Sequence, residues 1–215
     1  MARSRLTLPN LITAARIAAC PAIFFLALGS STSTRFWAFV LFVLASLSDL
    51  WDGYLARKHG WITDVGKLLD PVADKLLLVV TFVPFFLISH RPGPEGAIPW
   101  WGELPIWVLV VIFGRELFIT GFRSWAARRG MVISAGMSGK WKAFTQNLFI
   151  GAVLLWYPLT LTARSSGWEG SLYWEAWRTF HAAFVGLSLA VAVYLTVHSL
   201  LDYLWAYWAR VRSSP

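Results

Sequence analysis

Residues 49–74 read DLWDGYLARKHGWITDVGKLLDPVAD, and four of the five aspartates in this stretch form two closely spaced pairs between two long apolar segments of the chain. Asp49 and Asp52 are three residues apart, and Asp70 and Asp74 are four residues apart, so each pair lies on one face of its helix. The connection between the pairs contains glycine and threonine, which favour a break between helices. Two antiparallel helices joined in this way would point all four carboxylates at one another.

Carboxylates inside an apolar segment need a compensating partner, because charged side chains are costly in a membrane. The four could not all be ionised in a low dielectric without cations, and hard oxygen ligands select Mg²⁺, Mn²⁺ or Ca²⁺. The alternative is a set of helix caps and surface ion pairs, in which Asp52 and Asp74 pair locally with Arg57 and Lys75. The flanking Leu, Val and Trp residues serve such pairs poorly, so the sequence favours a divalent metal site.

The composition is that of a single membrane domain. The chain has 215 residues, of which 57% are hydrophobic, and its mean hydropathy is +0.58. We therefore expect residues 1–215 to form one domain with no room for an added soluble one. Arg16 interrupts the first apolar run, so we expect this segment to be retained rather than cleaved. The chain has a net charge of +8. We expect its basic residues to lie at the cytoplasmic face and to contact anionic lipids or phosphate substrates rather than nucleic acid.

Six apolar stretches are long enough to predict transmembrane helices. They cover residues 9–28, 36–57, 70–89, 104–127, 143–162 and 178–206. The fourth stretch is interrupted by Arg115, Glu116 and Arg123. The predicted fold class is all-α, a polytopic membrane bundle of six transmembrane helices.

Basic residues concentrate at one end of the predicted bundle. That end collects Arg3, Arg5, Arg57, Lys58, Lys67, Arg128, Arg129, Lys140, Lys142, Arg210 and Arg212. The opposite end has Arg35, Arg91, Arg164 and Arg178. Because positively charged loops stay in the cytoplasm, the sequence predicts an integral protein of the cytoplasmic (inner) membrane. Both termini and the aspartate motif are expected at the cytoplasmic face.

The aspartates belong to a longer pattern with the spacing D-x2-D-G-x2-A-R-x8-G-x3-D-x3-D. Its eight fixed positions are Asp49, Asp52, Gly53, Ala56, Arg57, Gly66, Asp70 and Asp74. The pattern resembles the motif of the CDP-alcohol phosphatidyltransferases, membrane enzymes that move a phosphatidyl group from a CDP-linked lipid to an alcohol and release CMP. The resemblance implies two divalent ions, Mg²⁺ or Mn²⁺. It also implies that Asp49, Asp52 and Asp70 bind metal, while Asp74 both touches metal and deprotonates the acceptor hydroxyl.

Donor-binding residues are expected on two segments. Gly53 and Ala56 would let the cytidine nucleotide approach the helix backbone, although small-residue helix packing is an alternative explanation. The resemblance assigns diphosphate binding to Arg57 and relief of crowding at the start of the third helix to Gly66. The candidates in the segment LPNLITAARI are Asn10, Thr13 and Arg16. Capping of the first helix explains the first two equally well.

A second charged cluster comprises Arg115, Glu116, Arg123, Arg128, Arg129, Lys140 and Lys142. Arg115 and Arg123 are eight residues apart and share a helix face. Lys140 follows Gly139 at the predicted start of a helix, where anions are favoured. We therefore predict that Arg115, Arg123 and Lys140 bind the acceptor phosphate. The other basic residues, Lys142 included, are predicted to anchor the protein at the cytoplasmic surface.

The segments LPNLITAARI, residues 8–17, and GREL to GKWKAFTQ, residues 114–146, resemble the branch of this family whose acceptor is sn-glycerol 3-phosphate. One departure is Ala143, where that branch often has threonine. The resemblance implies transfer of the phosphatidyl group of CDP-diacylglycerol to sn-glycerol 3-phosphate, a step of phospholipid biosynthesis. It also implies a possible homodimer, for which these residues define no interface.

Two alternatives stay open at this point. The nearer one keeps the chemistry and changes the acceptor to inositol phosphate, serine or phosphatidylglycerol, and the basic cluster disfavours serine. The other is a cation-coupled transporter, since intramembrane acids also line ion paths. A through-path should distribute polar groups across both halves of the bilayer, whereas the motif acids lie on one side.

Overall fold

The computed structural model describes residues 7–61, 63–92, 96–129 and 136–213. Within these ranges the chain forms helices without a named strand: α1 (Leu8–Leu28), α2 (Thr32–His59), α3 (Asp64–Ser89), α4 (Ile106–Arg128), α5 (Met137–Ser165) and α6 (Leu172–Ser213). The predicted all-α class is therefore confirmed, and each predicted apolar stretch corresponds to one helix.

The predicted break between the aspartate pairs is confirmed, and capping residues explain it. Gly60 ends α2 in the left-handed conformation with φ 67°, which glycine adopts without strain. Thr63 then caps α3, and its hydroxyl accepts the Gly66 N–H at 3.0 Å. The third helix thus begins six residues before the predicted apolar stretch. Asp70 consequently lies within α3 rather than at its first residue.

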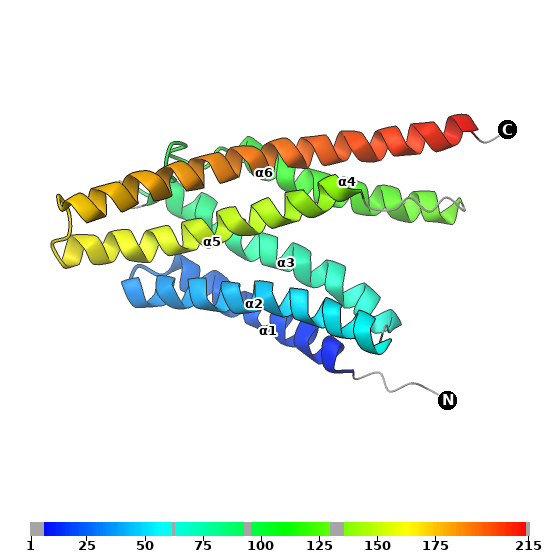
Figure 1. Cartoon of the computed structure of the whole chain (residues 1–215), viewed down its shortest axis with the longest axis horizontal. Helices are drawn as coiled ribbons and strands as arrows, with labels where there is room; N and C mark the ends of the chain where they lie inside the picture. Colours follow the sequence, from blue (N-terminus) through cyan, green and yellow to red (C-terminus); the bar gives the residue numbers. More distant parts are fainter. Residues whose placement is uncertain (1–6, 62, 93–95, 130–135, 214–215) are drawn as a thin grey trace.

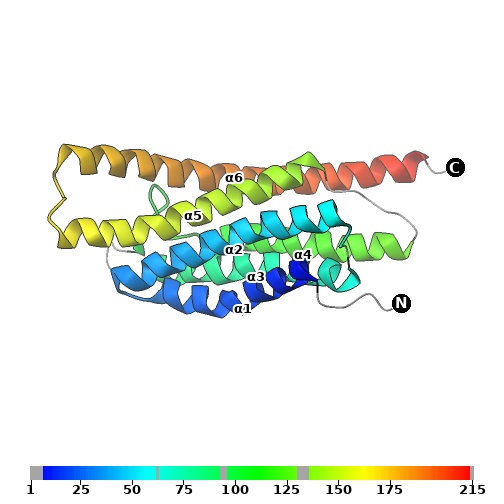
Figure 2. The same ribbon diagram turned by 60° about the horizontal axis from the view of Figure 1, so that its bottom comes forward.

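The helices form two arms that meet at one end (Figures 1 and 2). In the first arm α1 packs against both α2 and α3, and in the second α6 packs against both α4 and α5. Contacts between α2 and α5 join the arms. Aromatic side chains fill the join: Phe82, Phe85, Phe149 and Tyr157 are all buried, and the Phe82 and Phe149 ring centroids are 5.5 Å apart.

A smaller core holds the free end of the second arm. Ile119 and Ala126 of α4 are buried against Tyr203 of α6, and the Phe122 and Tyr207 rings lie 5.0 Å apart, edge to face. This cluster stands apart from the main core, so α4 is held there by α6 and not by α3. The free ends of the two arms can therefore stay separated.

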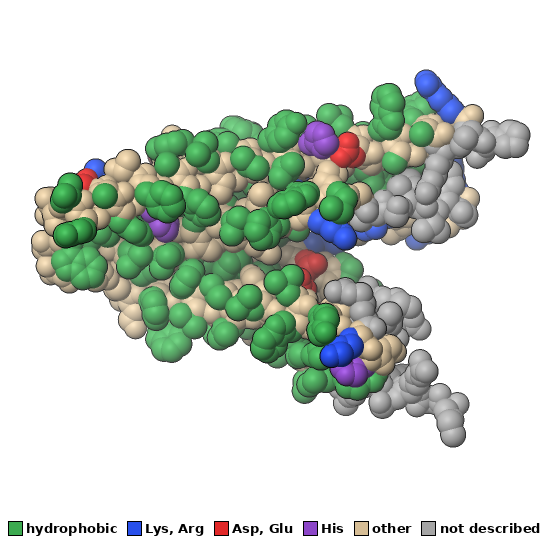
Figure 3. Space-filling model, in the orientation of Figure 1, with side chains coloured by type: hydrophobic (Ala, Val, Ile, Leu, Met, Phe, Trp, Pro, Cys, Tyr) green, Lys and Arg blue, Asp and Glu red, His purple; other side chains and the backbone are tan. Residues whose placement is uncertain are grey.

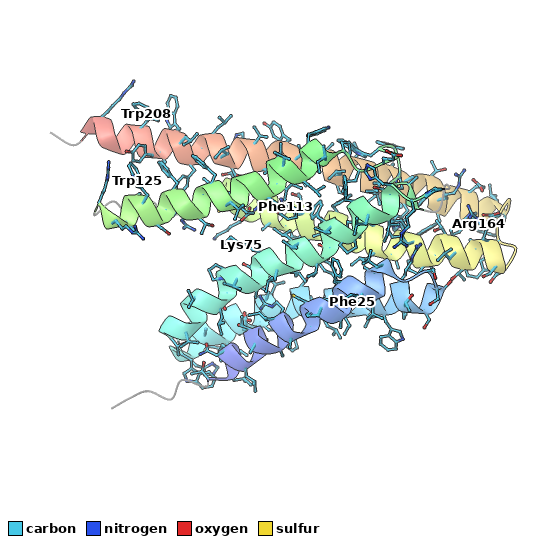
Figure 4. The ribbon with its side chains drawn as sticks, turned by 180° about the vertical axis from the view of Figure 1, so that it is seen from behind. Phe25, Lys75, Phe113, Trp125, Arg164 and Trp208 are labelled. Carbon is cyan, nitrogen blue, oxygen red and sulfur yellow. The ribbon has the colours of Figure 1, made fainter. Side chains whose placement is uncertain are left out.

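Five helices are long and apolar enough to cross a membrane: α1, α5 and most of α2, α3 and α6. These helices make the chain a multi-pass membrane protein. The sixth predicted span, α4, has a suitable length but is not among these five, and three charged residues, Arg115, Glu116 and Arg123, interrupt its apolar sequence. Figure 4 shows that Arg164 lies at the end where the arms join, while Trp125 and Trp208 lie at the open end. The start of α1 and the end of α6 also lie at the open end (Figure 1).

Candidate active site

The side chain of Arg16 gathers three of the four motif aspartates. Its Nη1 atom lies 2.5 Å from Asp49 Oδ1 and 3.4 Å from Asp74 Oδ1, and its Nη2 atom lies 2.5 Å from Asp52 Oδ2. Arg16 itself is buried on α1, so helices α1, α2 and α3 all contribute to one ion cluster. The structure therefore brings the two aspartate pairs together, as the spacing predicts, but around a guanidinium.

The fourth aspartate joins the cluster through a hydroxyl. Thr13 Oγ1 lies 3.1 Å from Asp52 Oδ2, from Asp70 Oδ1 and from the Pro9 carbonyl oxygen, so its single proton has three possible acceptors. Thr13 precedes Arg16 by one helical turn and shares its face of α1. One stripe of α1 thus touches all four motif aspartates.

Asn10 lies one turn before Thr13 and fixes the start of α3. Its amide nitrogen donates to Thr63 Oγ1 at 2.9 Å. A Cβ added to Gly66 would lie 2.8 Å from Asn10 Oδ1 and 3.2 Å from Thr63 Oγ1. Gly66 therefore permits the close approach of α1 and α3, which agrees with the crowding that the sequence assigned to this position.

The carboxylates fit a hard divalent cation by their chemistry. In the described part of the chain, one oxygen of each motif aspartate accepts no hydrogen bond, since the bonds involve Oδ1 of Asp49, Asp70 and Asp74 and Oδ2 of Asp52. Four such oxygens are ligands of the type that Mg²⁺ and Mn²⁺ prefer. In this arrangement, no group of three or more described His, Cys, Asp or Glu side chains forms a metal-holding cluster, and the Arg16 guanidinium stands between the carboxylates.

The structure does not show the alternative pairing of Asp74 with Lys75. Asp74 contacts Arg16, while the ammonium group of Lys75 donates to the Pro71 carbonyl at 3.3 Å. Asp52 is buried against Arg16 and Thr13. The side chain of Arg57 lies outside the described residues, so its predicted contact with the diphosphate stays a prediction.

Charged residues of the second arm face this cluster across a cavity. The cavity has a volume of about 130 Å³, and its lining includes Asp49 and Asp74 on one side and Glu116 and Lys142 on the other. Figure 3 shows the hollow between the arms, with Lys and Arg side chains on one lip and Asp or Glu side chains on the opposite lip. Seen from behind, Lys75 and Phe113 lie on facing sides of α3 and α4 where the arms separate (Figure 4).

The side of the cavity that the second arm forms is the basic wall, and an ion triad of Arg115, Glu116 and Lys142 lies there. The Glu116 carboxylate accepts hydrogen bonds from Arg115 Nη1 at 3.1 Å and from the Lys142 ammonium group. Lys142 is buried, so the structure does not place it on the surface where the sequence predicted an anchor. Lys140 and Arg123 are exposed, and Lys140 borders a different, apolar groove. The predicted phosphate-binding residues thus lie in three different surroundings.

The part of the chain that carries this site is similar to known proteins. Residues 6–194 match the CDP-alcohol phosphatidyltransferase family. The chain belongs to this family. It is 32% identical to the CDP-diacylglycerol–glycerol-3-phosphate 3-phosphatidyltransferase of Bacillus subtilis (strain 168), over 96% of this chain and 98% of the relative. It is 34% identical to a probable phosphatidylglycerophosphate synthase of Mycobacterium tuberculosis (strain ATCC 25618 / H37Rv), over 91% of this chain and 79% of the relative. An Arabidopsis thaliana relative, CDP-diacylglycerol–glycerol-3-phosphate 3-phosphatidyltransferase 2, is 31% identical over 94% and 80% of the two chains.

The remaining motif positions of this phosphatidyltransferase lie beside the aspartates. Gly53 follows Asp52 directly on α2, and Ala56 follows one turn later; both are half-buried. They occupy the last turns of α2 before the Gly60 cap, close to the open end of the arms. This position suits a nucleotide that enters from the open end.

Sequence reasoning assigned a different role to Arg16 and to Lys142. Arg16 was a candidate donor contact, whereas its side chain pairs with three aspartates. One signal could have indicated this role: Asn10, Thr13 and Arg16 repeat at three-residue intervals on one face of an otherwise apolar helix. For Lys142 the available signal was its four-residue separation from Gln146, which is also buried.

Proposed function

We propose that this chain transfers the phosphatidyl group of CDP-diacylglycerol to sn-glycerol 3-phosphate, which forms phosphatidylglycerophosphate and releases CMP. One observation carries the proposal: Asp49 and Asp74 of the aspartate cluster on the first arm face a buried lysine and its paired glutamate on the second arm across a single cavity. The names of the relatives in Bacillus, Mycobacterium and Arabidopsis support this donor and acceptor.

The motif aspartates would hold the metal ions. Asp49, Asp52, Asp70 and Asp74 would bind two Mg²⁺ or Mn²⁺ ions, which when bound neutralise the diphosphate and align the attacking and leaving oxygens. The buried Arg16 and Thr13 orient the carboxylates from α1. They position the ligands rather than touch the reacting atoms.

Asp74 is the carboxylate best placed to act as the base. It lines the cavity, and it is the most exposed of the three aspartates that contact Arg16. The acceptor hydroxyl oxygen forms a bond to the phosphatidyl phosphorus, its proton passes to the Asp74 carboxylate, and the bond from that phosphorus to the CMP oxygen breaks.

An apolar groove provides a place for the donor's acyl chains. It has a volume of about 770 Å³, lies between α2, α5 and α6, and ends at Asp49. Its lining includes Phe42, Leu50, Phe144 and Phe184. Because the groove lies within membrane spans and reaches the aspartates, acyl chains can occupy it while the diphosphate lies at the motif. Nucleotide binding would then fall to Gly53, Ala56, Arg57 and Gly66, with Asn10 and Thr13 supporting from α1.

The acceptor phosphate would bind at the basic wall. The sequence proposes Arg115, Arg123 and Lys140 as ligands, and the buried Lys142 is added because it lines the cavity. Lys140 borders the apolar groove instead, so we expect it to contribute less than Lys142. The open end of the arms would face the cytoplasm, because basic residues concentrate there. A soluble acceptor could then enter from the open end.

An acceptor panel tests this function. Purified protein with CDP-diacylglycerol and Mg²⁺ receives glycerol 3-phosphate, inositol phosphate, serine, glycerol or phosphatidylglycerol, and both CMP release and the lipid product are measured. We expect turnover with glycerol 3-phosphate and a large loss with unphosphorylated glycerol. Faster turnover with inositol phosphate or phosphatidylglycerol would mean that the acceptor assignment is wrong, while the phosphatidyl transfer of the family would still hold.

A further inference from the structure

The hydroxyl of Ser46 is buried without a hydrogen-bond partner among the described residues. Serine and threonine in the middle of a membrane helix usually donate to a carbonyl of the preceding turn. Ser48, two residues further along α2, does so, and its hydroxyl lies 2.8 Å from the Ala45 carbonyl oxygen. An unsatisfied hydroxyl inside a membrane is costly, so Ser46 is available for a ligand.

Ser46 lies where two cavities meet. The apolar groove and the smaller polar cavity share four lining residues: Ser46, Asp49, Ala143 and Asn147. Two of these are neutral polar side chains, and they come from different helices. The junction therefore offers hydrogen-bonding groups between an apolar compartment and a charged one.

The packing of α2 against α5 places Ser46 and Asn147 opposite one another. A Cβ added to Gly151 would lie 3.6 Å from the Phe42 ring, so these two residues mark the same level of the interface. The helices run antiparallel (Figure 1). One turn toward the aspartates leads from Phe42 to Ser46 and from Gly151 to Asn147.

We propose that Ser46 and Asn147 bind an acyl-ester carbonyl of the lipid donor and thereby select ester-linked over ether-linked CDP-lipids. The proposal rests on the proposed function. With acyl chains in the groove and the diphosphate at the aspartates, the glycerol backbone and its ester groups lie at the junction. Ser46 precedes Asp49 by three residues, roughly 4.5 Å along the helix axis, which is close to the span of a glycerol unit. A hydroxyl and a carboxamide both donate hydrogen bonds, and an ester carbonyl accepts them whereas an ether has no carbonyl.

The test compares CDP-diacylglycerol with its dialkyl ether analogue of equal chain length. Equilibrium binding of each lipid is titrated to the purified protein without acceptor, and the apparent KM for each is then measured with glycerol 3-phosphate. Ser46→Ala should weaken binding of the ester lipid by about three- to tenfold, the usual scale for one neutral hydrogen bond. Its binding of the ether lipid should stay within twofold of wild type. Asn147→Leu, which keeps the shape but cannot donate, should show the same selective loss.

Ser48→Ala is the matched control. It removes a hydroxyl from the same helix that already has a partner, and it should leave the ratio of ester to ether affinity unchanged. Equal affinity of the wild type for the two lipids, or equal losses in Ser46→Ala, would overturn the proposal. The binding titration contains no acceptor, so a wrong acceptor assignment leaves its result unaffected. Failure of both CDP-lipids to bind would instead overturn the proposed function.

Discussion

Replacing Arg16 by methionine is the sharpest test of the ion cluster, because methionine keeps an unbranched apolar side chain and removes the charge together with its hydrogen-bond donors. Arg16 is fully buried, and its three partners differ in exposure: the Asp52 side chain is 5% exposed, Asp49 is 41% exposed and Asp74 is 59% exposed. Exposed ion pairs contribute about 0–1 kcal/mol. Removing one partner of a buried pair costs about 3–5 kcal/mol, because the remaining charge has no compensation. The Arg16–Asp52 pair should therefore dominate the loss.

We expect Arg16→Met to lower the free energy of unfolding by about 3–5 kcal/mol in the presence of EDTA. The measurement is unfolding in detergent micelles by titration with a denaturing detergent, followed by tryptophan fluorescence. A second substitution identifies the partner: Asp52→Asn added to Arg16→Met should recover a large part of the loss, since no buried charge is then left alone. Asp74→Asn added to Arg16→Met should recover much less.

Two results would refute this reasoning. A loss below about 1 kcal/mol for Arg16→Met would mean that the buried pair adds no more than a surface pair. Equal recovery by Asp52→Asn and Asp74→Asn would mean that burial does not set the strength of these interactions. The circular dichroism of each variant in micelles confirms that helices are retained before the energies are compared.

Four further outcomes are expected. Chelation with EDTA should abolish CMP release and Mg²⁺ or Mn²⁺ should restore it, whereas full activity in excess EDTA would contradict the metal site. Asp74→Asn should bind CDP-diacylglycerol normally, as titration would show, while turnover falls at least about a hundredfold through loss of the base; wild-type turnover would mean that the proton leaves by another route. Lys142→Met should raise the apparent KM for glycerol 3-phosphate by about ten- to a hundredfold, and it should raise the KM for the lipid donor less. Lys140→Met should change the KM for glycerol 3-phosphate less than Lys142→Met does. Equal effects of Lys142→Met on both substrates would indicate damage to the fold. Gly66→Ala should lower the unfolding free energy by about 1–3 kcal/mol, because the added methyl group would lie 2.8 Å from the side-chain amide oxygen of Asn10 on α1. Gly114→Ala serves as the control and should not destabilise the protein, because nothing lies within 4 Å of a Cβ added there.

The helices and the aspartate pairs could be predicted from sequence because both depend on local signals. Apolar length identifies membrane helices, and three- or four-residue spacing places side chains on one face. The boundary of α3 was predicted six residues late for a physical reason. Hydropathy marks where lipid begins, whereas the Thr63 cap marks where helical hydrogen bonding begins.

The partners of the charged residues depend on distant contacts, which spacing does not encode. Arg16 meets aspartates that lie 33 to 58 residues away in sequence, and Lys142 meets Glu116 at a separation of 26 residues. Lys140 and Lys142 read alike in a sequence, but helix α5 turns one of them outward and buries the other. The rotation of α5 against α2 and α6 decides which lysine lines the cavity.

The two-arm architecture also explains why Arg16 cannot by itself prepare the site for an anionic donor. Arg16 is one guanidinium among four carboxylates, which leaves an excess of negative charge in this ion cluster. The triad of the second arm offsets little of it, because Glu116 neutralises one of its two cations. A diphosphate brought to this wall would meet net repulsion in a medium of low dielectric. Arg16 therefore holds the carboxylates in place, and the approach of the donor still needs further positive charge at the four carboxylate oxygens that accept no hydrogen bond in the described part of the chain.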